Sequence, residues 1–262
     1  MERHMTSSIT EQVLAAKVRQ DLGITLTLPI FNLFNLLRSQ GKHVIRYPFG
    51  FKGDTSALLA QMENIQYIAV DSTKNLGRQI FSTAHELGHM YMHSDRLYFI
   101  CSPDENSLCV NRSDERFADR FAACFLMPQL AIEVWATNNE VNLGNLGPHE
   151  VLRLQHAFQV SYAMTLNRLQ ALGMITPEAK VSWNSLSPIT LAKRWGMPTR
   201  LYEADSAIEV PEDYLAKWVD SYEAGRVSLA RLRNALERIG VDIETLALQH
   251  PTEAEYILHQ LF

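Results

Sequence analysis

The chain has 262 residues, a net charge of −5 and an apolar content of 47%. This composition supplies enough apolar residues for a proper core, and the length fits one large or two smaller domains. The acidic balance argues against a surface dominated by nucleic-acid contacts, and no apolar run reaches the roughly 18 residues that a membrane span needs. The cysteines Cys101, Cys109 and Cys124 lack zinc-ribbon spacing and indicate a reducing compartment, so we expect a cytoplasmic protein without a membrane partner.

The first seventy or so residues predict two helices followed by short strands. Helix-like apolar spacing covers residues 10–22 and 29–38, and Gly41 follows the second stretch. Short β-rich segments separated by Gly and Asp turns come next. We expect them to form a small sheet; they are His43–Tyr47, Ala57–Gln61 and Ile65–Val70.

Residues 85–89 read His-Glu-Leu-Gly-His, inside a stretch whose apolar spacing predicts a helix from roughly Lys74 to His93. Residues four apart lie on one helix face, so the imidazoles of His85 and His89 can reach one metal ion. Glu86 projects beside them, where its carboxylate can take a proton from water, and this donor set suits zinc.

The alternative is a buried helix whose histidines hydrogen-bond in the core. That alternative requires three polar groups to be satisfied without a metal. Gly88 costs about 1 kcal/mol relative to alanine in a helix interior, so its presence calls for a packing or access reason.

A catalytic zinc site needs a third protein ligand. His93 shares the histidine face, but it lies about 12 Å along the helix axis from His85, too far to share one ion. The metzincin arrangement needs a glycine where Met92 stands, so Asp95 is rejected as well.

A second amphipathic helix is predicted from a Ser/Asp start near residue 113 to just before Pro128. Glu115 and Asp119 lie four apart on one side of it. If it packs antiparallel to the first helix, Glu115 could bind the metal while Asp119 holds a histidine ring in the correct tautomer. Asp114 competes for the ligand role. The alternative is that these acids only form a solvated helix start, which the helix dipole favours.

Three stretches together resemble the ImmA/IrrE-type zinc metallopeptidases, a gluzincin-like family: IQYIAVDS, RQIFSTAHELGHMYMH and ERFADRFAACFLMP. The resemblance spans roughly residues 40–175. It implies an α+β, zincin-like peptidase domain with one Zn²⁺ per chain. Its implied site residues are the zinc ligands His85, His89 and Glu115, the general base Glu86, and Asp119 as a support of the site.

The second helix departs from the family pattern, which often reads Glu-x-Glu-Ala-Asn. Here Phe117 stands at the second Glu position and Asp119 at the Asn position. The ligand set stays intact, but any supporting role of that second Glu is in doubt.

Substrate contacts are less specific in the sequence. Tyr91, His93 and Tyr98 are the nearest groups that could donate a hydrogen bond to an oxyanion, although each is more often structural. In many zinc peptidases an edge strand aligns the substrate by strand addition, and here either 57–61 or 65–70 could do so.

We expect a peptidase domain over residues 1–135, a helix-turn-helix-like segment over 145–178 and a helical region over 187–262. In the middle segment Ser161 could cap the second helix, which carries Asn167, Arg168 and Gln170. DNA reading is one interpretation of this helix; packing against the catalytic domain, or docking of a protein partner, is the other.

The C-terminal region predicts one capped helix after Ser187 and three more, with Gly225 and Gly240 at the joins. It is either an ordinary bundle with a basic face or a module that recognises a partner or substrate protein, or DNA. The expected helices are Pro211–Glu223, Ser228–Ile239 and Asp242–Gln249.

These observations predict a zinc-dependent endopeptidase. The resemblance implies a dedicated protein substrate, a helix-turn-helix transcriptional repressor or an antitoxin, with DNA as the second candidate partner. The alternative function is a non-catalytic, metal-containing regulatory protein that binds a repressor or DNA through its helical C-terminal half.

Overall fold

The computed structural model describes residues 2–50, 55–62, 65–92, 112–211, 213–246 and 248. It confirms the α+β class: a three-stranded sheet is accompanied by many helices. The chain forms two compact units, Met1–Ala207 and Ile208–Phe262. Within the described part of the chain, no helix has the length and apolar character needed to cross a membrane.

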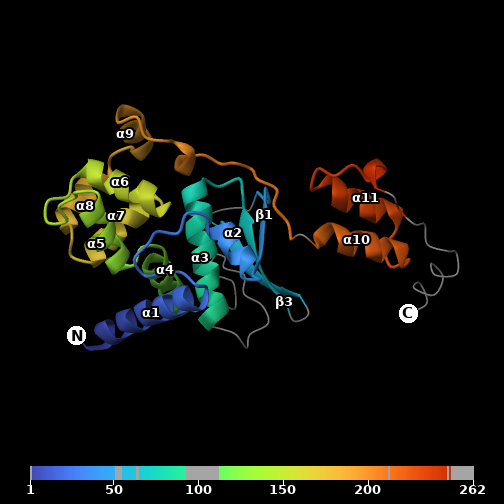
Figure 1. Ribbon diagram of the computed structural model, residues 1–262, viewed down its shortest axis with the longest axis horizontal. Coiled ribbons are helices and arrows are strands. Elements are labelled where there is room, and N and C mark those ends of the chain that lie inside the picture. Colours follow the sequence, from blue (N-terminus) through green and yellow to red (C-terminus); the bar gives the residue numbers. More distant parts are fainter. Residues whose placement is uncertain are drawn as a thin grey trace. The chain divides into compact units, whose positions relative to one another are not determined.

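Helices and strands are segregated along the first unit: two helices precede the three strands, and all later described elements are helical (Figure 1). In chain order they are α1 Glu2–Asp21, α2 Leu33–Ser39, β1 His43–Tyr47, β2 Ala57–Met62, β3 Ile65–Asp71, α3 Leu76–Met92, α4 Arg112–Leu126, α5 Gln129–Asn138, α6 Pro148–Phe158, α7 Tyr162–Ala171, α8 Pro177–Asn184, α9 Pro188–Arg194 and the 3₁₀ turn η1 Arg200–Tyr202.

The sheet has the order β1-β3-β2, which places β3 in its centre. β3 runs parallel to β1, with His43 opposite Tyr67, and antiparallel to β2, with Ala57 opposite Val70. Since β3 is paired on both sides, residues 65–70 cannot receive a substrate strand, and that candidate was wrong. The other candidate, β2, lies at an edge of the sheet.

Helix α3 runs between the sheet and α4 (Figure 1). Its buried apolar residues, including Ala84 and Leu87, join one core with Phe121 and Phe125 of α4 and with Ile68 of β3. Burying each of the large side chains contributes roughly 1.5–3 kcal/mol. This core fixes the relative position of the two helices that the sequence predicted to carry the metal ligands.

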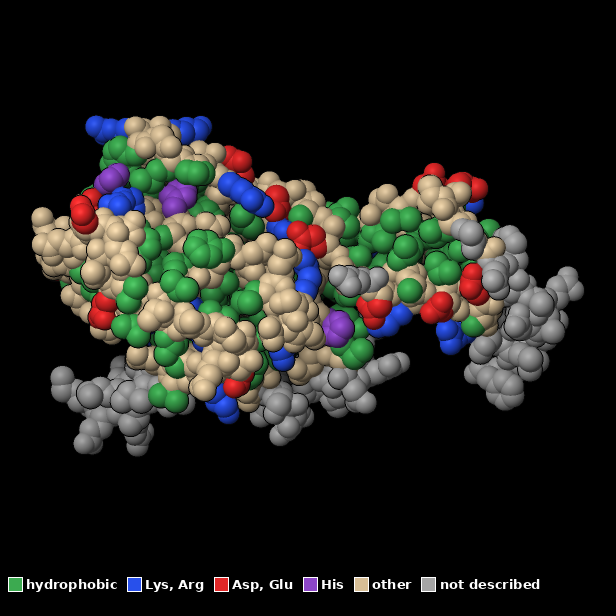
Figure 2. Space-filling model, viewed as in Figure 1, with side chains coloured by type: hydrophobic (Ala, Val, Ile, Leu, Met, Phe, Trp, Pro, Cys, Tyr) green, Lys and Arg blue, Asp and Glu red, His purple; other side chains and the backbone are tan. Residues whose placement is uncertain are grey.

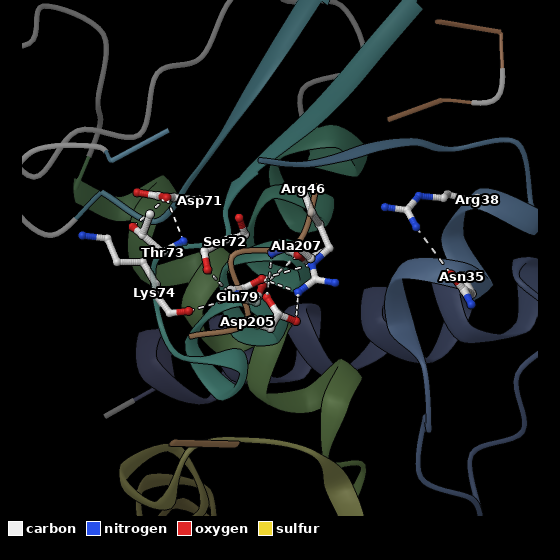
Figure 3. Close-up of polar contacts among 11 residues, drawn as sticks. Asn35, Arg38, Arg46, Asp71, Ser72, Thr73, Lys74, Gln79, Asp205 and Ala207 are labelled. Atoms are coloured by element: carbon white, nitrogen blue, oxygen red, sulfur yellow. Dashed lines mark hydrogen bonds and ion pairs between the residues drawn. The ribbon is translucent and has the colours of Figure 1, made fainter. Parts of the chain in front are cut away.

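A buried arginine on β1 holds the start of α3. Arg46, 3% exposed, donates from Nε and Nη2 to Oε1 of Gln79 at 3.0 and 2.8 Å, and it pairs with Asp205 (Figure 3). Its guanidinium also lies 4.3 Å from the ring centroid of Phe34. The sequence pattern did not predict this network, although Arg46 shares the buried side of β1 with Val44.

The backbone of the segment after η1 is hydrogen-bonded to residues at and just before the start of α3. The Leu76 amide donates to the Glu203 carbonyl at 2.9 Å, and the Ser206 amide donates to the Ser72 carbonyl at 3.1 Å. Residues 187–207, which the sequence placed with the C-terminal helices, therefore belong to the first unit.

Helices α6 and α7 occupy the segment with the helix-turn-helix-like pattern. The predicted cap is confirmed, because Ser161 Oγ accepts a hydrogen bond from the Met164 amide at 3.1 Å. Arg168 on the second helix does not face solvent: it is 7% exposed, and its Nε donates to the Met127 carbonyl at 2.9 Å.

Some boundaries differ from the prediction. α1 begins earlier, at Glu2, and α2 begins later, at Leu33, because the Asn32 side chain accepts from the Asn35 amide and caps the helix there. The helices α5 and α8 were not predicted.

The second unit contains α10 Tyr214–Glu223, α11 Leu229–Glu237 and the 3₁₀ turn η2 Ile243–Thr245 around a small core of its own. The helix expected over 242–249 is wrong in its described part. Asp242 caps one 3₁₀ turn and Leu246 is already extended, since only Ile243 is buried there. Figure 2 shows both acidic and basic side chains on the visible face of this unit.

Candidate metal centre

The three motif residues of α3 are turned toward the interior. His85 is 9% exposed, Glu86 2% and His89 1%, whereas most charged side chains in proteins remain in water. The helix can bury them because its apolar residues pack against the sheet and α4 on either side of the motif.

Gly88 allows α4 to approach this face closely. A Cβ atom at Gly88 would lie 2.8 Å from Cδ1 of Phe121 and 3.5 Å from Cα of Ala118. This is the packing reason that a glycine inside the helix required. The close approach brings Glu115, one turn earlier on α4, to the two histidines.

The side chains of His85, His89 and Glu115 converge, and we call this group the triangle. Nε2 of His85 lies 3.1 Å from Nε2 of His89, and the two oxygens of Glu115 lie 3.2 Å from these nitrogens, one each. Donors bound to one tetrahedral ion at about 2.0–2.1 Å are about 3.3 Å apart. The spacing and the chemistry of the donor set therefore fit one metal ion, and these residues could hold it.

The structure brings together the three residues that the sequence predicted as metal ligands. Asp114, the competing candidate, accepts a hydrogen bond from Ser113 Oγ at 3.2 Å on the exposed start of α4. Glu115 is also one of the acids that could have been a solvated helix start, but it is directed at the histidines.

Asp119 lies where the sequence expected it, behind His85. Nδ1 of His85 is 2.9 Å from Oδ1 of Asp119, so the ring donates to this carboxylate and presents Nε2 to the triangle. Donor and acceptor come from α3 and α4, which are separated in sequence but packed against each other.

The electrostatics of the triangle favour positive charge. Burial lowers the pKa of His85, but hydrogen bonds to Asp119 and Glu115 and the negative charge of Glu86 outweigh it and raise the pKa to about 10. Burial raises the pKa of Glu115, yet hydrogen bonds from His85 and His89 hold it well below its usual range. A cation at the centre is thus stabilised by several carboxylates.

The remaining candidates for substrate contact lie elsewhere. Tyr91 is in the last turn of α3, where its ring lies 5.3 Å from Nζ of Lys42. Burial raises its pKa, and the nearby charge of Asp21 adds to the effect. His93 and Tyr98 lie outside the described residues.

Beside the triangle is a cavity of about 740 Å³ that the sequence did not reveal, between α1, α3, α4 and α7. Asp119 lines it, and so do Phe81, Asn167 and Arg168. A signal was present in the sequence, because Arg168 falls on the helical stripe of Thr165, Leu169 and Leu172 rather than on the opposite face.

An α+β fold in which two histidines of one helix and a glutamate of the next converge is that of a zincin-like metallopeptidase. The sequence profile of the IrrE N-terminal-like domain family, peptidase M78, matches residues 38–170, and the chain belongs to this family. The matched range runs from the end of α2 into α7 and includes the whole triangle. No curated protein gave a match.

Proposed function

We propose that the protein is a zinc-dependent endopeptidase. The observation that carries the proposal is the triangle of His85, His89 and Glu115. The two Nε2 atoms lie 3.1 Å apart, each lies 3.2 Å from one Glu115 oxygen, and the buried Glu86 is on the same helix as the histidines. Membership of a metallopeptidase family supports the reaction class.

Each residue then has a definite task. When bound, zinc lowers the pKa of a water molecule and polarises the scissile carbonyl. His85 and His89 offer neutral nitrogens, and Asp119 fixes the His85 tautomer that leaves Nε2 available. Glu86 accepts a proton from the attacking water as the new C–O bond forms, and it delivers that proton to the amine nitrogen as the C–N bond breaks.

An edge strand is available to align the substrate. β2 lies at the edge of the sheet and packs against α3, the helix that carries the histidines. An extended peptide added to β2 would gain backbone hydrogen bonds that do not depend on its side chains. Selection of the cleavage site would then come from side-chain pockets.

The substrate we propose is a single helix-turn-helix repressor or antitoxin, cut at one site so that the genes it silences are released. The family resemblance supports this choice. The unit of α10 and α11 is the proposed recognition module. Its acidic and basic side chains favour a protein partner over DNA, which attracts clustered positive charge.

The decisive test compares wild type with Glu86→Gln. We expect about one zinc per chain in both by elemental mass spectrometry, and proteolysis by wild type only. Labelling of new protein N-termini in cells that produce either form should show one dominant cut that is absent from the Glu86→Gln cells.

Glu133→Gln is the matched control, because it makes the same change on α5, where Glu133 accepts from Gln129. It should cleave like wild type. If Glu86→Gln and wild type release the repressed genes equally, the protein is a regulator that acts by binding and the enzymatic proposal is wrong.

A further inference from the structure

The cavity beside the triangle contains a buried charge that the catalytic residues do not use. Arg168 of α7 lines the cavity and is 7% exposed. Its Nε donates to the Met127 carbonyl at 2.9 Å, and no carboxylate among the residues that the structure describes pairs with it. A guanidinium keeps its positive charge in proteins, and a buried charge without a counter-ion is costly.

The thiol of Cys124, which interacts with Arg168, does not neutralise its charge. Cys124 lines the same cavity, and burial raises the pKa of its thiol, although Arg168 opposes this shift. The thiol is therefore neutral near pH 7 and contributes no negative charge.

Three other arginines of this unit have partners that Arg168 lacks. Arg120, also in the cavity wall, pairs with the buried Glu11, and Arg46 pairs with Asp205. Arg19 is fully buried without a carboxylate, but it donates to the carbonyls of Thr25, Leu28 and Phe125. Arg168 has one carbonyl partner and faces a space large enough for a ligand.

One side chain, Asp119, borders both the cavity and the proposed metal centre. Asp119 lines the cavity wall, and its Oδ1 lies 2.9 Å from Nδ1 of His85. A volume of about 740 Å³ is within the range of ligand pockets in proteins. A peptide that extends from the triangle past the exposed Asp119 side chain would enter this cavity.

We propose that this cavity binds a carboxylate of the peptide substrate, with Arg168 as its counter-ion, and so selects acidic substrates. The proposal rests on the peptidase function proposed above. The carboxylate comes either from an Asp or Glu side chain near the scissile bond or from the C-terminus of the substrate. A guanidinium can hold either one through two parallel N–H···O bonds.

The test measures peptide binding without cleavage. Zinc-loaded full-length Glu86→Gln protein is titrated calorimetrically with three synthetic ten-residue peptides capped at the N-terminus. The first has a central Glu and an amidated C-terminus, the second has Gln in place of that Glu, and the third is the Gln peptide with a free C-terminal carboxylate.

We expect the Glu peptide, the free-carboxylate peptide or both to bind at least about tenfold more tightly than the amidated Gln peptide. The peptide that shows the gain identifies the source of the carboxylate. Arg168→Gln should remove the gain, and Arg168→Lys should retain part of it. Arg194→Gln, the same change on an exposed arginine of α9, should leave it intact.

Loss of the Met127 hydrogen bond could unfold Arg168→Gln, so a second variant uses an exposed position. Asn167 lies at the cavity and is exposed, and Asn167→Asp adds a negative charge there without burying it. It should weaken binding of the preferred peptide several-fold and leave the amidated Gln peptide unchanged.

Equal affinity for all three peptides, or a gain that survives both Arg168→Gln and Asn167→Asp, overturns the proposal. Wild type that cuts peptides without any preference for acids also overturns it, while the peptidase function stands. The converse outcome is a carboxylate-dependent gain in affinity that requires Arg168 in a protein that cuts no peptide. That result supports the proposed carboxylate site and contradicts the peptidase function.

Discussion

Oδ1 of Asp119 lies 2.9 Å from Nδ1 of His85, on the ring edge opposite the nitrogen that faces Glu115. The Asp119 side chain is 58% exposed, so the bond does little for the core. Its effect is on the ring: it fixes which nitrogen carries the proton and which one is available as a ligand.

Removing this carboxylate should weaken metal binding without unfolding the protein. We expect Asp119→Ala to lower zinc affinity by about 10–100-fold, as measured by competition with a chromophoric chelator. Asp119→Asn keeps an oxygen that accepts the same hydrogen bond, so it should stay closer to wild type. Asp114→Ala, on the exposed start of α4, is the control, and an equal loss in that variant would contradict the assigned role.

Metal uptake should release a proton from His85. In the metal-free protein its pKa is about 10, because the hydrogen bonds to Asp119 and Glu115 outweigh burial. Protons therefore compete with zinc throughout the range below pH 10, and affinity should rise about tenfold per pH unit between pH 7 and pH 9. Calorimetry in buffers of different ionisation enthalpy should detect about one proton per ion. A pH-independent affinity would contradict this assignment.

Gly88→Ala should perturb the site through packing. Alanine favours a helix by about 1 kcal/mol over glycine, but its Cβ would lie 2.8 Å from Phe121 Cδ1, so the Phe121 ring or the helix that carries it must shift. Overpacking of this kind costs about 1–3 kcal/mol, and we expect a lower free energy of unfolding together with weaker zinc binding.

The cause can be isolated with a double-mutant cycle. Phe121→Leu shortens the opposing side chain, so combining it with Gly88→Ala should recover zinc affinity lost by Gly88→Ala alone. Strict additivity of the two changes would show that Gly88 does not act through Phe121.

The pairing of Asp205 with Arg46 should stabilise the first unit at neutral pH. Burial raises the pKa of Asp205, but the hydrogen bonds and charge of Arg46 outweigh it and hold the pKa below its ordinary value of 3.8. A group with a depressed pKa stabilises the fold above its unfolded value, and this contribution is lost as the pH falls through the folded value.

Asp205→Asn should therefore lower the free energy of unfolding at pH 7 by about 1–3 kcal/mol, since it leaves the Arg46 charge buried with weaker partners. The difference from wild type should shrink in urea titrations carried out well below pH 3.8. Glu203→Gln, an exposed acid two residues away, should be nearly neutral. A constant difference at all pH values would show that the carboxylate charge is not involved.

Much of the local structure could be predicted because its causes are local. Strand β1 was predicted with the bounds that the structure has, from alternation and the glycines beyond it. The cap at Ser161 and the end of α4 before Pro128 depend on hydrogen bonds and steric limits within a few residues. The last predicted helix failed because, among its described residues, Ile243 alone is buried in the small C-terminal core.

The sequence alone determined that His85 and His89 share a face with Glu86 beside them, because helical periodicity places residues four apart together. It also limited the third ligand to a few acids near residue 115. Only the tertiary structure decided that Glu115 closes the triangle, that β2 is the edge strand and that Arg168 turns inward. The tertiary structure alone also decided that Arg46 pairs with Asp205, which lies 159 positions away in the chain. Such pairings depend on which apolar surfaces pack together over the whole chain, and no local pattern records that choice.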